Sequence, residues 1–208
     1  MTINTEDLLN SILGSLGRIS YIKAEDIPNI DLYMDQVTTF MNEKLKSSTR
    51  YPSTDKILTK TMINNYAKND LLPPPIRKKY SREHILVLIF IYYYKGVMSI
   101  NDIQTLLKPI TDKYFAGRKD FDLEKVYTEV FELEEDQVER MKENIMEEYR
   151  QSRDTFSDAP EEDQEFLKQF SFICMLSFDV YVKKLLIEKL IDNMSTKEPA
   201  RKKKLDKI

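Results

Sequence analysis

The sequence predicts an all-α protein with little or no β structure, and three observations support this class. The 208-residue chain holds only four glycines, whereas strand-rich folds need many turn glycines. Apolar residues recur at helical spacing over long segments, beginning with residues 5–16. Helix N-cap residues, among them Thr59, Ser81 and Ser99, stand just before further apolar segments.

Two helices are expected within residues 26–69. The first is capped by Asp31 and runs to about Lys46, and the second follows a polar loop and is capped by Thr59. The second is short, reaching about Asn69. Its apolar side chains can face a core (Met62, Ile63 and Tyr66), and its polar side chains share the opposite face (Thr61, Asn64, Asn65 and Lys68).

The three prolines of residues 73–75 end this short helix, because proline cannot donate a backbone hydrogen bond. Residues 76–80 are then expected to form an extended basic strip. Ser81 caps an apolar helix that runs to about Lys95. Ser99 and Asp102 have the spacing of a capping box, and the helix that they start is expected to end near Leu107, before Pro109.

The rest of the chain is predicted as a helical C-terminal region. Residues 122–152 form one long acidic helical stretch, and a second long helix follows over about 161–194. Between residues 170 and 182 the second helix is apolar nearly all round, so we expect it to be buried on several sides. Cys174 within it is expected to be a small buried thiol.

These elements divide the chain into four parts. An N-terminal helix occupies residues 1–25 and a helix-turn-helix unit residues 26–116. The helical C-terminal region covers residues 117–195, and a disordered basic tail covers residues 196–208.

The net charge of −3 hides an uneven distribution. Residues 54–84 hold seven cationic and three acidic side chains, which gives +4. Residues 120–166 hold 18 acidic and five basic side chains, which gives −13. A basic island in an acidic chain is typical of a local binding site for a polyanion.

The sequence indicates neither an enzyme nor a cofactor or metal site. The single histidine, His84, has no partner that the sequence nominates for acid–base chemistry, so a structural role is expected. The single cysteine excludes a disulfide framework and a multi-cysteine metal site. The chain lacks a glycine-rich phosphate loop, and the carboxylates of residues 120–166 are spaced as a solvated helix face.

A cytoplasmic protein without membrane contact is expected. The longest apolar run, residues 85–94, is about half of what a membrane span needs. The N-terminus carries Glu6 and Asp7 rather than the basic n-region of a signal peptide.

The basic segment predicts binding to double-stranded DNA. Asparagine can pair with adenine in the major groove, and lysine can reach guanine or phosphate. Arginine and lysine after the proline turn would hold phosphates. The candidate DNA-binding residues are Lys60, Thr61, Asn64, Asn65, Lys68, Arg77, Lys78, Lys79, Tyr80 and Arg82.

The same segment resembles the N-terminal DNA-binding domain of MerR-type transcription regulators. Residues 63–66 (INNY) take the place of that family's L-R-Y-Y motif, and residues 70–75 (DLLPPP) the place of G-L-L-P-P-P. Residues 80–84 (YSREH) and 98–103 (MSINDI) are similar to the next two helix starts. The resemblance implies a helix-turn-helix with a wing, although Asn64 and Asn65 replace residues that touch DNA in that family, and the segment between Pro75 and Tyr80 is shorter and lacks its glycine.

Over most of its length the chain looks more like the bacterial family known as domain of unknown function 1836. The resemblance rests on residues 31–37 (DLYMDQV), 58–66 (LTKTMINNY) and 79–84 (KYSREH). It implies a compact helical protein of about this size, and it implies no activity.

Alternatives to DNA binding stay open. A protein-interaction module that keeps the scaffold without reading DNA is one, because a surface of −13 would repel a duplex unless it points away. Sensing of a small-molecule effector is another, with a pocket formed by aromatic residues (Tyr92, Tyr93, Tyr94, Phe170, Phe172 and Phe178). A homodimer is expected, because DNA readers usually pair.

Overall fold

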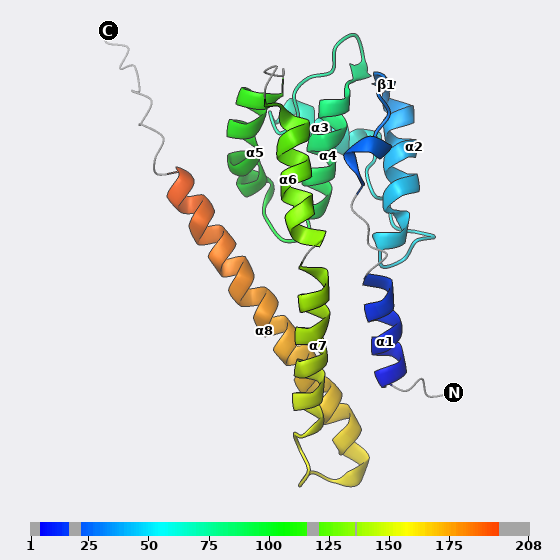
Figure 1. The fold of residues 1–208 in the computed structure, drawn as a ribbon, viewed down its shortest axis with the longest axis vertical. Coiled ribbons are helices and arrows are strands. Elements are labelled where there is room, and N and C mark those ends of the chain that lie inside the picture. The colour runs from blue at the N-terminus through cyan, green and yellow to red at the C-terminus, as the bar shows by residue number, and fades with distance from the viewer. Residues whose placement is uncertain (1–4, 17–21, 116–120, 136, 196–208) are drawn as a thin grey trace.

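The computed structural model describes residues 5–16, 22–115, 121–135 and 137–195, and these residues are mostly helical, as predicted (Figure 1). In chain order the elements are α1 (Thr5–Leu16), η1 (Ala24–Asp26), β1 (Leu32–Tyr33), α2 (Met34–Leu45), η2 (Lys46–Ser48), α3 (Lys60–Lys68), β2 (Lys79–Tyr80), α4 (Arg82–Tyr94), α5 (Ile100–Tyr114), α6 (Leu123–Glu135), α7 (Val138–Arg153) and α8 (Glu161–Ser195). The expected disordered tail, residues 196–208, lies outside the described residues.

The main core is built around α4. Every residue from His84 to Ile91 is buried, because neighbouring elements cover this helix on all sides. The helices α5 and α6 and the strand β2 contact α4 directly. At its C-terminal end, Phe90 meets Tyr127 and Phe131 of α6, with ring centroids 5.4 and 5.5 Å away. The core cluster extends from Ile22 to Phe131, so it includes α6, which lies beyond residue 116.

Two predicted helix ends differ from the structure. The helix α2 begins at Met34 rather than after Asp31, because β1 intervenes and the Tyr33 N–H donates to the Gln36 side chain at 2.9 Å. The helix α5 continues through Pro109 to Tyr114 instead of ending near Leu107. Its apolar stripe continues beyond the proline with Ile110 and Tyr114, which pack on the core and offset the lost backbone hydrogen bond.

A second, smaller core lies outside the first. It joins α1, α7 and α8 through four buried side chains (Leu9, Leu13, Tyr149 and Phe172). Tyr149 and Phe172 meet edge to face with ring centroids 5.4 Å apart. We refer to α7 and α8 together as the arm, which extends away from α2 and β1 (Figure 1).

The prediction of one continuous acidic helix over residues 122–152 is wrong. The chain forms α6 and α7 with a break between Glu135 and Val138. The two helices serve different cores, since Phe131 belongs to the first and Tyr149 to the second. A break between them lets each helix present its own apolar side to its own cluster.

The middle of α8 is exposed, whereas the sequence predicted burial on several sides. Phe170 is 52% exposed, Phe178 68% and Val182 45%, and Cys174 is exposed rather than buried. Within the chain, α8 contacts only α7 and α5 closely along its 35 residues, among the described elements. A helix that is apolar nearly all round therefore keeps much of its apolar surface in water. None of the described helices is long and apolar enough to cross a membrane.

Candidate nucleic-acid interface

The helix α3 buries one side and exposes the other. Thr59 caps it, as predicted, with its hydroxyl oxygen accepting from the Met62 N–H at 3.2 Å. Ile63 and Tyr66 anchor it in the core, while Met62 lies at the surface, contrary to the prediction. The predicted polar face (Thr61, Asn64, Asn65 and Lys68) is exposed, and Lys60 is exposed at the start of the same helix.

The end of α3 is fixed to its surroundings. Asp70 takes a left-handed φ of 54°, and the N–H groups of Leu71 and Leu72 then both donate to the Tyr66 carbonyl, at 2.9 and 3.1 Å. From α5, the Gln104 amide donates to the Asn69 carbonyl at 2.9 Å. The exposed face of α3 is thus held on a rigid scaffold.

Residues 76–79 form a tight hairpin turn, which corrects the predicted extended strip. Ile76 and Lys79 exchange two backbone hydrogen bonds, of 3.1 and 2.9 Å. The two residues between them, Arg77 and Lys78, have φ values of 51° and 65°. Both angles lie in the left-handed region and give the turn the sense of type I′, which suits two-residue hairpins. We call this turn the wing tip.

The wing tip continues into a two-stranded antiparallel sheet. Tyr33 of β1 pairs with Lys79 of β2, and Leu32 pairs with Tyr80. The sheet therefore joins the wing to the segment that precedes α2. A short hairpin, which we call the wing, therefore forms despite the short segment and the missing glycine.

A chain of contacts links the wing to α3. The Lys79 ammonium lies 5.3 Å from the centre of the Tyr33 ring. Asp35, two residues after Tyr33 and in the first turn of α2, forms an ion pair with Lys60 in the first turn of α3. The wing tip and the polar face of α3 therefore belong to one continuous surface, which we call the basic face.

Two of the predicted site residues lie inside the scaffold. Tyr80 is 3% exposed, and burial raises the pKa of its hydroxyl. Arg82 points toward the protein, where its guanidinium donates to the carbonyls of Ile27 (3.1 Å) and Ala24 (2.7 Å) and pairs with Glu124. Of the ten predicted residues, the other eight lie on the basic face or at its base.

His84 supports the wing from beneath. Its Nδ1 accepts the Ser81 N–H at 2.9 Å, so Ser81 begins α4 as predicted, and its Nε2 lies 3.4 Å from the Pro74 carbonyl. Its ring also meets Tyr80 and Phe115 edge to face. Burial lowers the pKa of His84, which keeps the imidazole neutral and the Ser81 N–H bond in place. The predicted structural role fits these contacts.

One acidic cluster lies at the other end of the molecule. Figure 1 shows the turn between α7 and α8 at the opposite end of the long axis from β1 and the segment before β2. The acidic first turn of α8 (Glu161, Glu162 and Asp163) stands directly after that turn. This acidic cluster therefore lies far from the basic face.

The aromatic residues suggested for an effector pocket are distributed over separate places. Tyr92, Tyr93 and Tyr94 pack at the edge of the first core, and Phe172 belongs to the second. Phe170 and Phe178 are exposed on α8. Across the described residues, no group of three or more histidine, cysteine, aspartate or glutamate side chains is arranged to hold a metal ion.

Sequence reasoning missed two features of this face. The type I′ turn was hidden because Arg-Lys stands where Asn-Gly is the usual signal. The Asp35–Lys60 pair joins residues that are 25 positions apart, and spacing within one helix does not reveal it. A sequence signal for either feature could have come only from the expected wing, because the strand after a wing turn needs an antiparallel partner, and here that partner is the segment before α2.

Comparison with protein families gives a match to this chain. It covers residues 22–130, just over half of the chain, and the family is described as a domain of unknown function (DUF1836). The matched segment spans nearly the whole first core, together with α3 and the wing. Comparison with curated proteins and with solved structures gives no match.

Proposed function

Since the chain belongs to this family of unknown function, we propose that it is a DNA-binding transcriptional regulator of the MerR-like helix-turn-helix type. It acts in the cytoplasm as a homodimer on double-stranded DNA. The proposal is supported by the order of α2, α3 and a wing followed by α4, together with the resemblance of residues 63–103 to the MerR-type segment.

In this proposal α3 enters the major groove. Asn64 and Asn65 are adjacent on its exposed face, and an asparagine amide can both donate to and accept from an adenine edge. Thr61 and Lys68 lie one turn to either side. The ion pair with Asp35 fixes Lys60 at the start of the helix, so Lys60 serves orientation more than charge.

In the same proposal, the wing tip binds the phosphate backbone of the DNA. Arg77 and Lys78 are exposed at the end of a two-residue turn, and Lys79 stands at its base against Tyr33. Arginine and lysine are the usual phosphate contacts of DNA-binding proteins. The three cations project from one rigid hairpin, so they can hold one backbone segment while α3 reads the groove.

The observation that carries the proposal is the left-handed backbone at Arg77 and Lys78. Residues with a Cβ cost roughly 1–3 kcal/mol each in this region, and glycine or asparagine avoids most of that cost. The chain instead keeps two long cations at the tip. Strained backbone that presents charged side chains to solvent is typical of binding sites.

The direct test is fluorescence anisotropy of the full chain on mixed-sequence duplexes. We expect binding at about 50 mM salt that weakens on the order of a thousandfold by about 200 mM, because some six phosphate contacts release counterions. Absence of binding up to tens of micromolar protein at low salt would sink the proposal. Selection of bound duplexes from a random pool then gives the sequence preference.

Two sets of variants distinguish base recognition by α3 from phosphate contacts by the wing tip. Lys78→Ala with Lys79→Ala should weaken binding to all duplexes alike and lower the salt slope by about two. Asn64→Ala should cost about 1–3 kcal/mol on the selected sequence and much less on others. Arg140→Gln with Arg150→Gln on α7 is the matched control, because it removes the same charge far from the basic face.

The alternative is a helical protein-interaction module that keeps the scaffold without reading DNA. The Asp35–Lys60 pair favours it, since a carboxylate at the start of α3 offsets part of the positive charge there. A pulldown that recovers one protein partner and no DNA, from cells in which the chain is expressed at its natural level, would support this alternative.

A further inference from the structure

The longest helix carries an apolar strip that the chain itself leaves in water. We define the α8 strip as six side chains that recur every three to five residues and are 39–68% exposed: Phe166, Phe170, Ile173, Phe178, Tyr181 and Leu185. Two aromatic pairs lie along it: Phe166 stacks with Phe170, and the rings of Phe178 and Tyr181 are tilted by 32° with centroids 6.4 Å apart. The spacing places the six side chains on one broad face of the helix.

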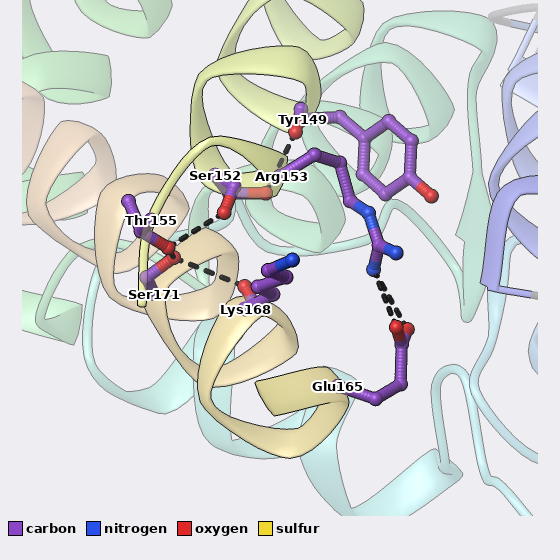
Figure 2. Close-up of polar contacts among 7 residues, drawn as sticks. All are labelled: Tyr149, Ser152, Arg153, Thr155, Glu165, Lys168 and Ser171. Atoms are coloured by element: carbon purple, nitrogen blue, oxygen red, sulfur yellow. Dashed lines mark hydrogen bonds and ion pairs between the residues drawn. The ribbon is translucent and has the colours of Figure 1, made fainter. Parts of the chain in front are cut away.

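The opposite face of α8 is fixed. Figure 2 shows that both Glu165 carboxylate oxygens accept from Arg153 of α7 at 2.8 Å. At the edge of this face, the hydroxyl of Thr155, in the turn after α7, lies 3.2 Å from that of Ser171. Phe172 is buried against Tyr149 on the same side. Because these contacts fix the rotation of α8, the helix cannot turn its strip inward.

The strip is larger than an ordinary exposed patch. A large aromatic side chain presents about 150–250 Å² when fully exposed, so the six residues together expose roughly 700 Å². The largest apolar patch on a typical monomer is about 300–600 Å². A partner in a stable complex contributes about 800 Å², which the strip nearly supplies by itself.

We propose that the α8 strip binds the α8 strip of a second copy of this chain, with the two helices antiparallel. The distribution of charge along α8 favours a second copy as the partner and an antiparallel orientation of the two helices. Residues 161–163 hold three carboxylates beyond Glu165, and residues 183–189 hold three lysines and one glutamate, with Lys183 and Lys184 also paired to Asp179 and Glu188 along the helix. Antiparallel pairing brings the acidic start of each helix beside the lysines of the other, whereas parallel pairing places like charges together.

The remaining parts of the chain are poor candidates to cover the strip. Residues 196–208 contain six lysine or arginine residues and only two large apolar ones, Leu205 and Ile208. A two-fold axis, by contrast, makes one patch complementary to itself and buries both copies at once. The pairing deepens the homodimer in the proposed function, and it is argued from the arm alone, without reference to DNA.

The first test is the mass of the full chain by light scattering after size exclusion, without DNA. We expect a dimer at micromolar concentration. Phe178→Asp should raise the dissociation constant by about a hundredfold or more, because it places a carboxylate in the interface of both copies. Leu133→Asp is the matched control, since Leu133 is 65% exposed on α6 and away from the strip. It should leave the dimer intact.

The second test uses the exposed Cys174, which lies between Ile173 and Phe178. An axis through the middle of the strip brings the two copies of Cys174 close together, so a short bismaleimide should link native chains into covalent dimers. Cys174→Ser should abolish the link and keep the light-scattering dimer.

Three results would overturn the pairing. They are a monomer at high micromolar concentration, a dimer that Phe178→Asp leaves unchanged, and a native dimer that the bismaleimide does not link. A monomer that binds duplex DNA would refute the pairing and leave DNA binding standing, and a dimer that ignores DNA would do the reverse.

Discussion

The Arg82 guanidinium lies 2.7 Å from the Glu124 carboxylate and joins the first turn of α4 to the first turn of α6. The same guanidinium satisfies the carbonyls of Ala24 and Ile27. Replacing Arg82 by Met should lower the free energy of unfolding by about 2–4 kcal/mol, because both carbonyls lose a donor. Glu124→Gln should cost less than about 1 kcal/mol, since Glu124 is partly solvated. Urea unfolding of the two variants would contradict this account if their losses were equal.

The free energy of unfolding should fall as the pH drops below the pKa of histidine in the unfolded chain. Burial lowers the folded pKa of His84 below its ordinary value near 6.5, despite the opposing effects of Glu83 and Asp31. The stabilisation is therefore complete above the unfolded pKa and is lost as the pH falls from about 6.5 toward the folded pKa, with a slope of at most about 1.4 kcal/mol per pH unit. Denaturant unfolding at a series of pH values measures it.

His84→Gln supplies the control for that measurement. Glutamine does not titrate, so the variant should be less stable near neutral pH and should lose the histidine slope between about pH 6.5 and 5. An unchanged slope in the variant would assign the effect to another group.

Relaxing the wing tip should stabilise the fold and weaken DNA binding together. Arg77→Asn with Lys78→Gly fits the type I′ turn without strain, so we expect a gain of about 1–2 kcal/mol in unfolding free energy. The same change removes two cations from the tip, which should lower the salt slope of duplex binding by about two. Thermal unfolding and anisotropy on one preparation give both quantities. Opposite signs are expected, and a loss of stability would show that the tip is not strained.

Removing the proline inside α5 should stabilise the helix. Pro109 is exposed, and alanine there restores a backbone donor and the better helix propensity, for a gain of about 1–2 kcal/mol. Such a gain corresponds to roughly 2–8 °C in melting temperature for a chain of this size. Lys108→Ala, at the neighbouring exposed position, should change the melting temperature little. Equal shifts in the two variants would place the effect outside the backbone.

The sequence predicted the helices and their caps best where local chemistry decides them. Thr59, Ser81 and Ser99 each begin a helix as expected, since a cap is read from neighbouring residues. The exposed face of α3 followed from helical spacing alone. The resemblance to the family of unknown function is confirmed by the family match over residues 22–130, whereas the resemblance to the MerR-type segment stays a prediction.

The predictions from sequence were wrong where contacts with distant parts of the chain determine the structure. The helix of residues 100–107 was expected to end before Pro109 because proline has a low helix propensity. The helix continues because packing of Ile110 against the core outweighs that propensity. The burial of Arg82 depends on carbonyls from residues 24 and 27, which the spacing around residue 82 does not reveal. The apolar α8 was expected inside the fold because its pattern shows how much apolar surface exists and not whether the same chain covers it.

The two hydrophobic cores differ greatly in size, and this difference bears on motion. Among the described residues, the second core has four buried side chains (Leu9, Leu13, Tyr149 and Phe172), which contribute at most roughly 1.5–3 kcal/mol each. Local opening of this part therefore requires far less free energy than unfolding of α4. We therefore expect the amide hydrogens of α7 to exchange with solvent while those of α4 remain protected, and thermal melting of the chain to depart from a single cooperative step.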